Sequence, residues 1–261
     1  MRPWILEEVN YGHVKANPYH VAVLPMGATE PHNLHLPYGT DTYQVNAIAR
    51  RACAEATAKG AKVVMLPAIP YGTETNMMTF PLAMNVLPST LLAVFRDLID
   101  SLGRHNVRRL VILNGHGGND FKPFLRELYG RAGVHLFLCD WFRGLSADAH
   151  AEIFETRDDH AGEVETSLML HIAPNLVARD TETGALKADA GATRSTRLPS
   201  INKGWLSITR PWHLLTTNSG SGNPMKATAE KGKAMMDLLV SRLTESLVEL
   251  SAAELDEKFP Y

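Results

Sequence analysis

The sequence predicts a doubly wound α/β fold built on a mainly parallel sheet. The first observation is a set of short, non-alternating apolar runs rich in β-branched residues, at residues 20–25, 61–67, 109–113 and 134–139. Such runs are typical of central strands that are covered on both faces. The second is that helix-like segments separate them, because strands and helices that alternate at this spacing favour parallel βαβ units.

Three predicted helices lie between the predicted strands, and two more follow them. The first three span residues 42–59, 88–102 and 122–132, and each is followed by a glycine suited to a helix end. The later two span residues 162–171 and 226–250. Residues 174–224 are rich in Gly, Thr, Ser and Asn, which predicts an elaborated loop region. Since no repeat or low-complexity linker interrupts the chain, we expect a single domain over residues 1–261.

Composition excludes several classes of function. The net charge is −2, from 26 Lys and Arg against 28 Asp and Glu, so nothing in the overall charge favours nucleic acid or an anionic membrane. No run approaches 18 uncharged apolar residues, so no membrane-spanning helix is expected. Two cysteines cannot form a disulfide framework, and the N-terminus lacks a signal-peptide pattern. We therefore expect a cytoplasmic protein.

Histidines and carboxylates follow the predicted strands or open predicted helices. They are Glu30, His32, Asp41, His116, His160, Glu163 and Glu165. Ligands of parallel α/β sheets bind beyond the carboxyl ends of the strands, so these side chains are expected at one edge. Imidazole and carboxylate donors without thiolate suit Zn²⁺ or Mn²⁺, including a pair of ions bridged by one carboxylate.

Each of these residues also has a simpler interpretation, and Glu30 with His32 could be an ordinary surface pair. Asp41 precedes a helix and could cap its N-terminus, and Asn114 to Gly118 could form a plain turn. His160 could cap the following helix, and Glu163 and Glu165 could be solvated residues of its first turn. All the segments fall at the same predicted edge of the sheet, and this shared location favours one common site over several unrelated local roles.

Four motifs in order resemble the creatininase family, also called creatinine amidohydrolases. Residues 27–41 match the first motif at Gly27, Glu30, His32, His35, Leu36, Pro37, Gly39, Thr40 and Asp41. Residues 114–119 and 160–167 match the second and third, and residues 222–224 with 227–232 resemble the C-terminal one. The resemblance covers residues 20–235. It implies a three-layer α/β/α fold, a dinuclear metal centre and a homo-oligomer, often a hexamer.

The resemblance also implies roles for single residues. It makes Glu30, His32, Asp41 and His116 metal ligands, with Asp41 as the bridge. Creatininase has a glutamate two residues after the second-motif histidine, where this chain has Gly118. Glu165 is therefore expected as the fifth ligand, with Glu163 left open as an alternative. His160 is expected to handle protons, with Glu163 as a second acid/base candidate. The expected ions are two divalent metals, Zn²⁺ or Mn²⁺, with Fe²⁺ also compatible.

Departures from the family pattern indicate an altered substrate. Pro31, Asn33 and Leu34 replace motif residues, and residues 80–83 read Phe-Pro-Leu-Ala instead of Phe-Pro-Gly-Thr. The missing glutamate at Gly118 argues against creatininase activity itself. Trp141 could stack on a flat substrate or simply pack at the sheet edge.

Three hypotheses for function follow. The leading one is a metal-dependent hydrolase that cleaves a C–N bond of a small cyclic amide by means of a metal-bridging hydroxide. The alternative keeps the metal centre but opens a keto-inositol or sugar-like ring by C–C cleavage. The third is a non-catalytic protein that binds metal or a small molecule. A nucleotide site is not expected, because residues 115–118 lack both the dinucleotide-binding glycine spacing and the P-loop lysine.

Overall fold

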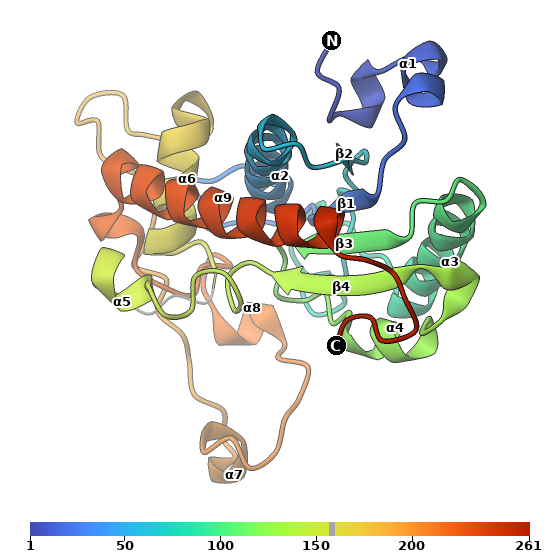
Figure 1. Cartoon of the computed structure of the whole chain (residues 1–261). Helices are drawn as coiled ribbons and strands as arrows, with labels where there is room; N and C mark the ends of the chain where they lie inside the picture. The colour runs from blue at the N-terminus through green and yellow to red at the C-terminus, as the bar shows by residue number, and fades with distance from the viewer. Residues whose placement is uncertain (157–159) are drawn as a thin grey trace.

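A computed structural model of the protein describes residues 1–156 and 160–261. Within them, a parallel sheet has the strand order β2-β1-β3-β4 (Figure 1). Its strands are β1 (Val21–Met26), β2 (Val63–Met65), β3 (Arg109–Asn114) and β4 (His135–Asp140). Val21 aligns with Val63 on one side and with Arg109 on the other. All four predicted strands are therefore present, and every pairing is parallel.

The α-helices of the described residues include all five predicted ones and four short ones that the sequence analysis did not predict. They are α1 (Tyr11–Ala16), α2 (Thr40–Ala58), α3 (Pro88–Arg104), α4 (Lys122–Glu127), α5 (His150–Ile153), α6 (Glu163–Ile172), α7 (Pro199–Asn202), α8 (Trp212–Leu215) and α9 (Ala229–Ala252). Helix α3 continues through Gly103, and the left-handed turn falls at Asn106 instead (φ 60°). Helix α4 ends earlier than predicted, ahead of the left-handed Gly130 (φ 72°).

Alternate residues of the strands pack against helices on opposite faces of the sheet. Val21, Val23 and Val111 belong to one buried cluster, which also holds residues of α2, α6 and α9. Ala22, Leu24, Leu110 and Ile112 belong to a second cluster with residues of α3 and α4. Figure 1 shows α9 crossing one face of the sheet. Burial on both faces explains the continuous apolar runs and confirms the α/β/α layers.

Helices α6 and α9 approach each other closely at Gly232. A Cβ at this position would lie 1.9 Å from the carbonyl oxygen of Ser167 in α6. Thr228 caps α9 by accepting a hydrogen bond from the Lys231 amide (3.2 Å). The glycine lets α9 hold α6 against the body, and α6 begins at the edge of the sheet where the polar residues gather.

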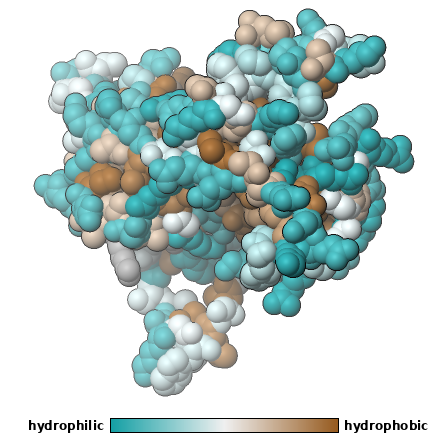
Figure 2. Space-filling model, in the orientation of Figure 1, coloured by the Kyte–Doolittle hydropathy of each residue, from teal (hydrophilic) through white to brown (hydrophobic). Residues whose placement is uncertain are grey.

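The predicted loop region between α6 and α9 contains two short α-helices, α7 and α8. The part that carries α7 extends away from the body of the molecule (Figures 1 and 2). Several of its apolar side chains are exposed, among them Leu198, Trp205 and Leu206. None of the helices in the described ranges has the length and apolar character to cross a bilayer. The organisation as one domain stays a prediction.

Candidate metal centre

The segment after β1 carries Glu30 and His32 into the interior. Gly27 lets α2 approach this segment closely, because a Cβ there would lie 2.8 Å from the Thr42 backbone nitrogen of α2. His32 is fully buried, and its Nδ1 lies 3.1 Å from the Glu30 carbonyl oxygen. Since a carbonyl oxygen only accepts, Nδ1–H is the donor. Nε2 is then left facing Asp41, whose Oδ1 is 3.0 Å away.

Asp41 lies in the first turn of α2, but it does not cap that helix. The N-cap residue is Gly39, which has no side-chain cap. The Asp41 carboxylate instead lies between two imidazoles, with Oδ1 3.0 Å from His32 Nε2 and Oδ2 3.2 Å from His116 Nδ1. This placement fits a carboxylate shared by two ions, and the bridging role stays a prediction.

Asn114, the last residue of β3, shapes the loop that presents His116. Its Oδ1 accepts from the His116 amide (3.2 Å), and its Nδ2 donates to the His116 carbonyl (3.0 Å) and to Asp140 Oδ1 (2.8 Å). The His116 ring then faces Glu30, with Nδ1 2.8 Å from Glu30 Oε1. The glycine-rich segment is thus more than a plain turn, because it aims an imidazole at the carboxylates.

His160 precedes α6 and lines the cavity. An antiparallel bridge to Ser221 holds its backbone in place. Its Nε2–H donates to the Pro31 carbonyl (2.9 Å), so Nδ1 is the acceptor nitrogen and lies 3.7 Å from Glu30 Oε1. The ring is 4.2 Å from the His32 ring and 5.7 Å from that of Trp212, centroid to centroid. These contacts fix its orientation.

The two glutamates at the start of α6 have different surroundings. Glu165 points into the cluster, with Oε1 3.8 Å from His32 Nε2 and Oε2 accepting from the Ala161 amide. The Glu163 carboxylate forms an ion pair with Lys231 and accepts from the Glu155 and Thr156 amides (3.0 Å each). In the described chain, Glu163 is not among the residues that line the cavity. Its contacts favour a structural role, and the acid/base role expected from the sequence stays a prediction.

Glu74 also joins the cluster, and the sequence analysis missed it. It follows β2, its side chain is completely buried, and Oε1 lies 2.8 Å from His116 Nε2. That approach lacks hydrogen-bond geometry, and neither carboxylate oxygen has a hydrogen-bond partner among the described residues. A signal was available, because Glu74 follows a predicted strand of the same sheet and so falls at the same edge as the other polar segments.

The buried carboxylates and imidazoles of the cluster shift one another's pKa values. Burial alone would lower the pKa of His32 and of His116, but nearby carboxylates raise both pKa values well above the ordinary range. Burial, together with the charge of Glu30, raises the pKa of Glu74 to about 8. Buried carboxylates require nearby positive charge. Here that charge can come from protonated imidazoles or from bound cations.

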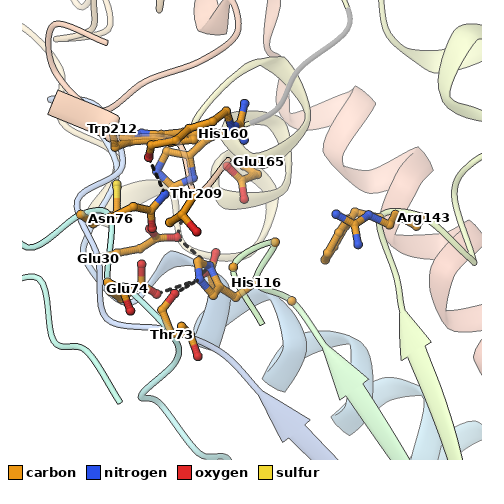
Figure 3. A pocket seen from close by; sticks show the side chains of 18 of the residues that line it. Glu30, Thr73, Glu74, Asn76, His116, Arg143, His160, Glu165, Thr209 and Trp212 are labelled. Atoms are coloured by element: carbon orange, nitrogen blue, oxygen red, sulfur yellow. Dashed lines mark hydrogen bonds and ion pairs between the residues drawn. The ribbon is translucent and has the colours of Figure 1, made fainter. Parts of the chain in front are cut away.

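The residues form candidate metal sites. Two of the groups whose possible ligand atoms lie within 4.8 Å of one another are Glu30–Glu74–His116 and His32–Asp41–Glu165. The fit to cations is supported by oxygens of Glu30, Asp41 and Glu74 that have no hydrogen-bond donor among the described residues. Figure 3 shows Glu30 and Glu74 beside His116. His160 and Glu165 lie on another side of the cavity, and Arg143 lies across it. The cavity measures about 660 Å³.

A parallel α/β fold with buried imidazoles and carboxylates at the carboxyl ends of its strands is the arrangement of a metal-binding hydrolase. The chain belongs to the creatininase family, because the family model described as "Creatininase: Creatinine amidohydrolase" matches residues 7–247. The expected family is thereby confirmed, and the protein is a hydrolase of that family.

Relatives and solved structures agree with this assignment. The chain is 31% identical to the mycofactocin precursor peptide peptidase of Mycobacterium tuberculosis (strain CDC 1551 / Oshkosh) over 233 residues, covering 85% of this chain and 83% of that protein. It is 31% identical to the creatinine amidohydrolase of Pseudomonas putida over 180 residues, covering 61% and 67%. A candidate creatinine amidohydrolase from Bacteroides fragilis NCTC 9343 aligns with a TM-score of 0.87 at 34% identity, covering 98% and 100%. A manganese form of creatininase aligns over 96% and 99% with a TM-score of 0.73 at 22% identity, which shows the shared fold.

Proposed function

We propose that this protein hydrolyses an amide C–N bond of a small or peptide-like substrate at a centre that holds two divalent cations. The observation that carries the proposal is the buried cluster of imidazoles and carboxylates beside an open cavity. Several of its carboxylate oxygens lack a hydrogen-bond donor among the described residues. Ligand chemistry of this kind suits Zn²⁺ or Mn²⁺, with Fe²⁺ also compatible.

The proposed ligands fall into two sets around a shared carboxylate. Glu30 and His116 would hold one ion, His32 and Glu165 the other, and Asp41 would contact both, since its two oxygens face the two imidazoles. When bound, such a pair of cations acidifies a water and polarises a carbonyl group. The chain's part is to fix the donors in position and to limit access of bulk water, because these residues are nearly all buried.

His160 is proposed as the group that carries the proton to the leaving nitrogen. With Nε2–H committed to the Pro31 carbonyl, Nδ1 is the atom that accepts and releases the proton. It lies on the cavity side, near Glu30. An imidazole suits this two-way transfer near neutral pH.

Cavity size bears on the choice of substrate. Pockets for drug-sized ligands measure about 300–1,000 Å³, so the cavity of about 660 Å³ would leave much space around a single small ring. The names of the mycobacterial and Pseudomonas relatives both describe hydrolysis of an amide bond. A peptide-like amide therefore fits this cavity better than the small cyclic amide predicted from the sequence, although both are cleaved at a C–N bond.

The test combines metal removal with a substrate panel. Chelator-treated protein should lose turnover, and Zn²⁺ or Mn²⁺ should restore it. The panel contains short peptides, cyclic amides and a keto-inositol, and release of an amine or ammonia identifies C–N cleavage. Full turnover after chelation would contradict the metal mechanism. Activity on the keto-inositol alone would favour C–C cleavage instead.

We also propose a homo-oligomer, with a hexamer as the form implied by the family resemblance. The exposed apolar side chains of the segment around α7 support this proposal, because apolar surface of this kind is common at protein interfaces. Light scattering after size exclusion tests it, and a monomer at micromolar concentration would contradict it. The cytoplasmic location stays a prediction.

A further inference from the structure

We propose that Glu74, in the segment after β2, is a further ligand of the cation at the Glu30–His116 position, in addition to Glu165 at the other position. The inference rests on the proposed function, because it assumes that the Glu30–His116 position binds a cation. It goes further by assigning a ligand that none of the sequence motifs contains.

The surroundings of Gly118 show that this glycine leaves room for Glu74 beside His116. A Cβ at Gly118 would lie 2.3 Å from His116 Nε2 and 2.6 Å from the Thr73 carbonyl oxygen. Any side chain at position 118 would therefore collide with both the His116 ring and the Thr73 carbonyl. The glycine leaves the space in which Thr73 and Glu74 come up against His116, with Glu74 Oε1 2.8 Å from Nε2.

Hydrogen bonds from the described residues do not explain the burial of the Glu74 carboxylate. Its amide donates to Asn85 Oδ1 (2.8 Å), which fixes the backbone, but neither carboxylate oxygen receives a hydrogen bond from a described residue. The Nε2–H of His116 is directed at the Thr73 carbonyl (3.3 Å) instead. Leaving a carboxylate buried and unpaired is costly. A cation between Glu74, Glu30 and His116 removes that cost, and their possible ligand atoms lie within 4.8 Å of one another.

The experiment measures cation binding directly. The full-length wild type, E74Q and E74D are stripped of metal and titrated with Zn²⁺ and, separately, Mn²⁺ against a chromophoric chelator. E163Q is the matched control, because Glu163 is equally buried but is held by Lys231. We expect two equivalents in the wild type and in E163Q. In E74Q one site should weaken by more than the about 10- to 100-fold that loss of an outer partner causes. E74D should bind more tightly than E74Q.

The outcomes separate this inference from the proposed function. Less than one equivalent in the wild type overturns the proposed function. Two equivalents in the wild type with unchanged affinities in E74Q, or a loss of 100-fold or less, overturn the inference alone. Metal-free E74Q should unfold at the same temperature as the metal-free wild type or at a higher one, because the amide replaces a buried carboxyl group whose oxygens have no hydrogen-bond partner among the described residues. An E74Q protein that fails to fold would therefore also contradict the inference.

Discussion

The protein buries carboxylates in two neighbouring regions that differ in how the charge is neutralised. At the start of α6, the Glu163 carboxylate forms an ion pair with Lys231 and accepts hydrogen bonds from two backbone amides and the Thr156 hydroxyl. In the cavity cluster, Glu30, Asp41 and Glu74 all have oxygens without a hydrogen-bond donor among the described residues. Only two positions separate Glu163 from Glu165, yet the helix directs one into each region.

The contrast shows how to distinguish a structural carboxylate from a functional one. The charge and hydrogen-bonding capacity of Glu163 are satisfied by the protein itself, so its replacement should reduce stability and leave cation binding intact. The cavity carboxylates differ, because several of their oxygens receive no hydrogen bond from a described residue. Their loss should affect cation binding and turnover first. This difference in local chemistry is visible only after folding, since all of these residues are acidic and lie next to the same sheet edge.

The largest effect is expected for D41N. Asp41 faces both His32 and His116, so the amide should weaken both cation positions together. The rate should fall by more than the about 100- to 1,000-fold that loss of one oxyanion donor causes. Metal content and turnover are measured on the same preparation. A D41N protein with two tightly bound ions and normal turnover would contradict the functional role given to the cavity carboxylates.

A smaller effect is expected for H160Q. The substitution removes the Nδ1 acceptor, and we expect kcat to fall about 100- to 10,000-fold. The two equivalents of metal should remain bound, because Glu30, His32 and Asp41 are unchanged. Metal analysis alongside kcat and KM shows whether His160 acts as a proton carrier or as a metal ligand. Loss of one ion in H160Q would make His160 a ligand instead of a proton carrier.

The sequence predicted the scaffold well because burial leaves a clear pattern. The apolar runs of β1 and β3 and the length of α2 were readable, since strands covered on both faces are apolar throughout. It also predicted that Glu30 and His116 would lie near each other. Glu74 was missed because its role depends on a contact between segments after β2 and β3. The partner of Glu163 was missed because Lys231 lies in α9, far along the chain.

Next in size is the stability effect of E163Q. Replacing the charged acceptor weakens the hydrogen bonds from Thr156 and from Lys231, and we expect a loss of about 1–3 kcal/mol in the free energy of unfolding. Burial alone would raise the pKa of Glu163, but its donors hold the pKa below the ordinary 4.5. The stabilisation is therefore present above that pH and lost as the pH falls through the lowered value.

Urea unfolding of the wild type and E163Q across pH measures this effect. The difference in unfolding free energy should stay constant between about pH 7 and 5 and narrow below pH 4.5. Turnover at neutral pH should match the wild type when both are folded. A large fall in kcat without loss of stability would instead restore the acid/base role that the sequence suggested for Glu163.

The smallest effect is expected for E155Q, which removes the second carboxylate bound to the same lysine. Glu155 Oε1 lies 3.0 Å from Lys231 Nζ, but the Glu155 side chain is 57% exposed. Water and salt screen such a pair, and exposed ion pairs contribute little to stability. The urea midpoint of E155Q should therefore equal that of the wild type within experimental scatter. If E155Q were as unstable as E163Q, the contribution of this region to the free energy of unfolding would depend on the Lys231 ion pairs and not on the burial of Glu163.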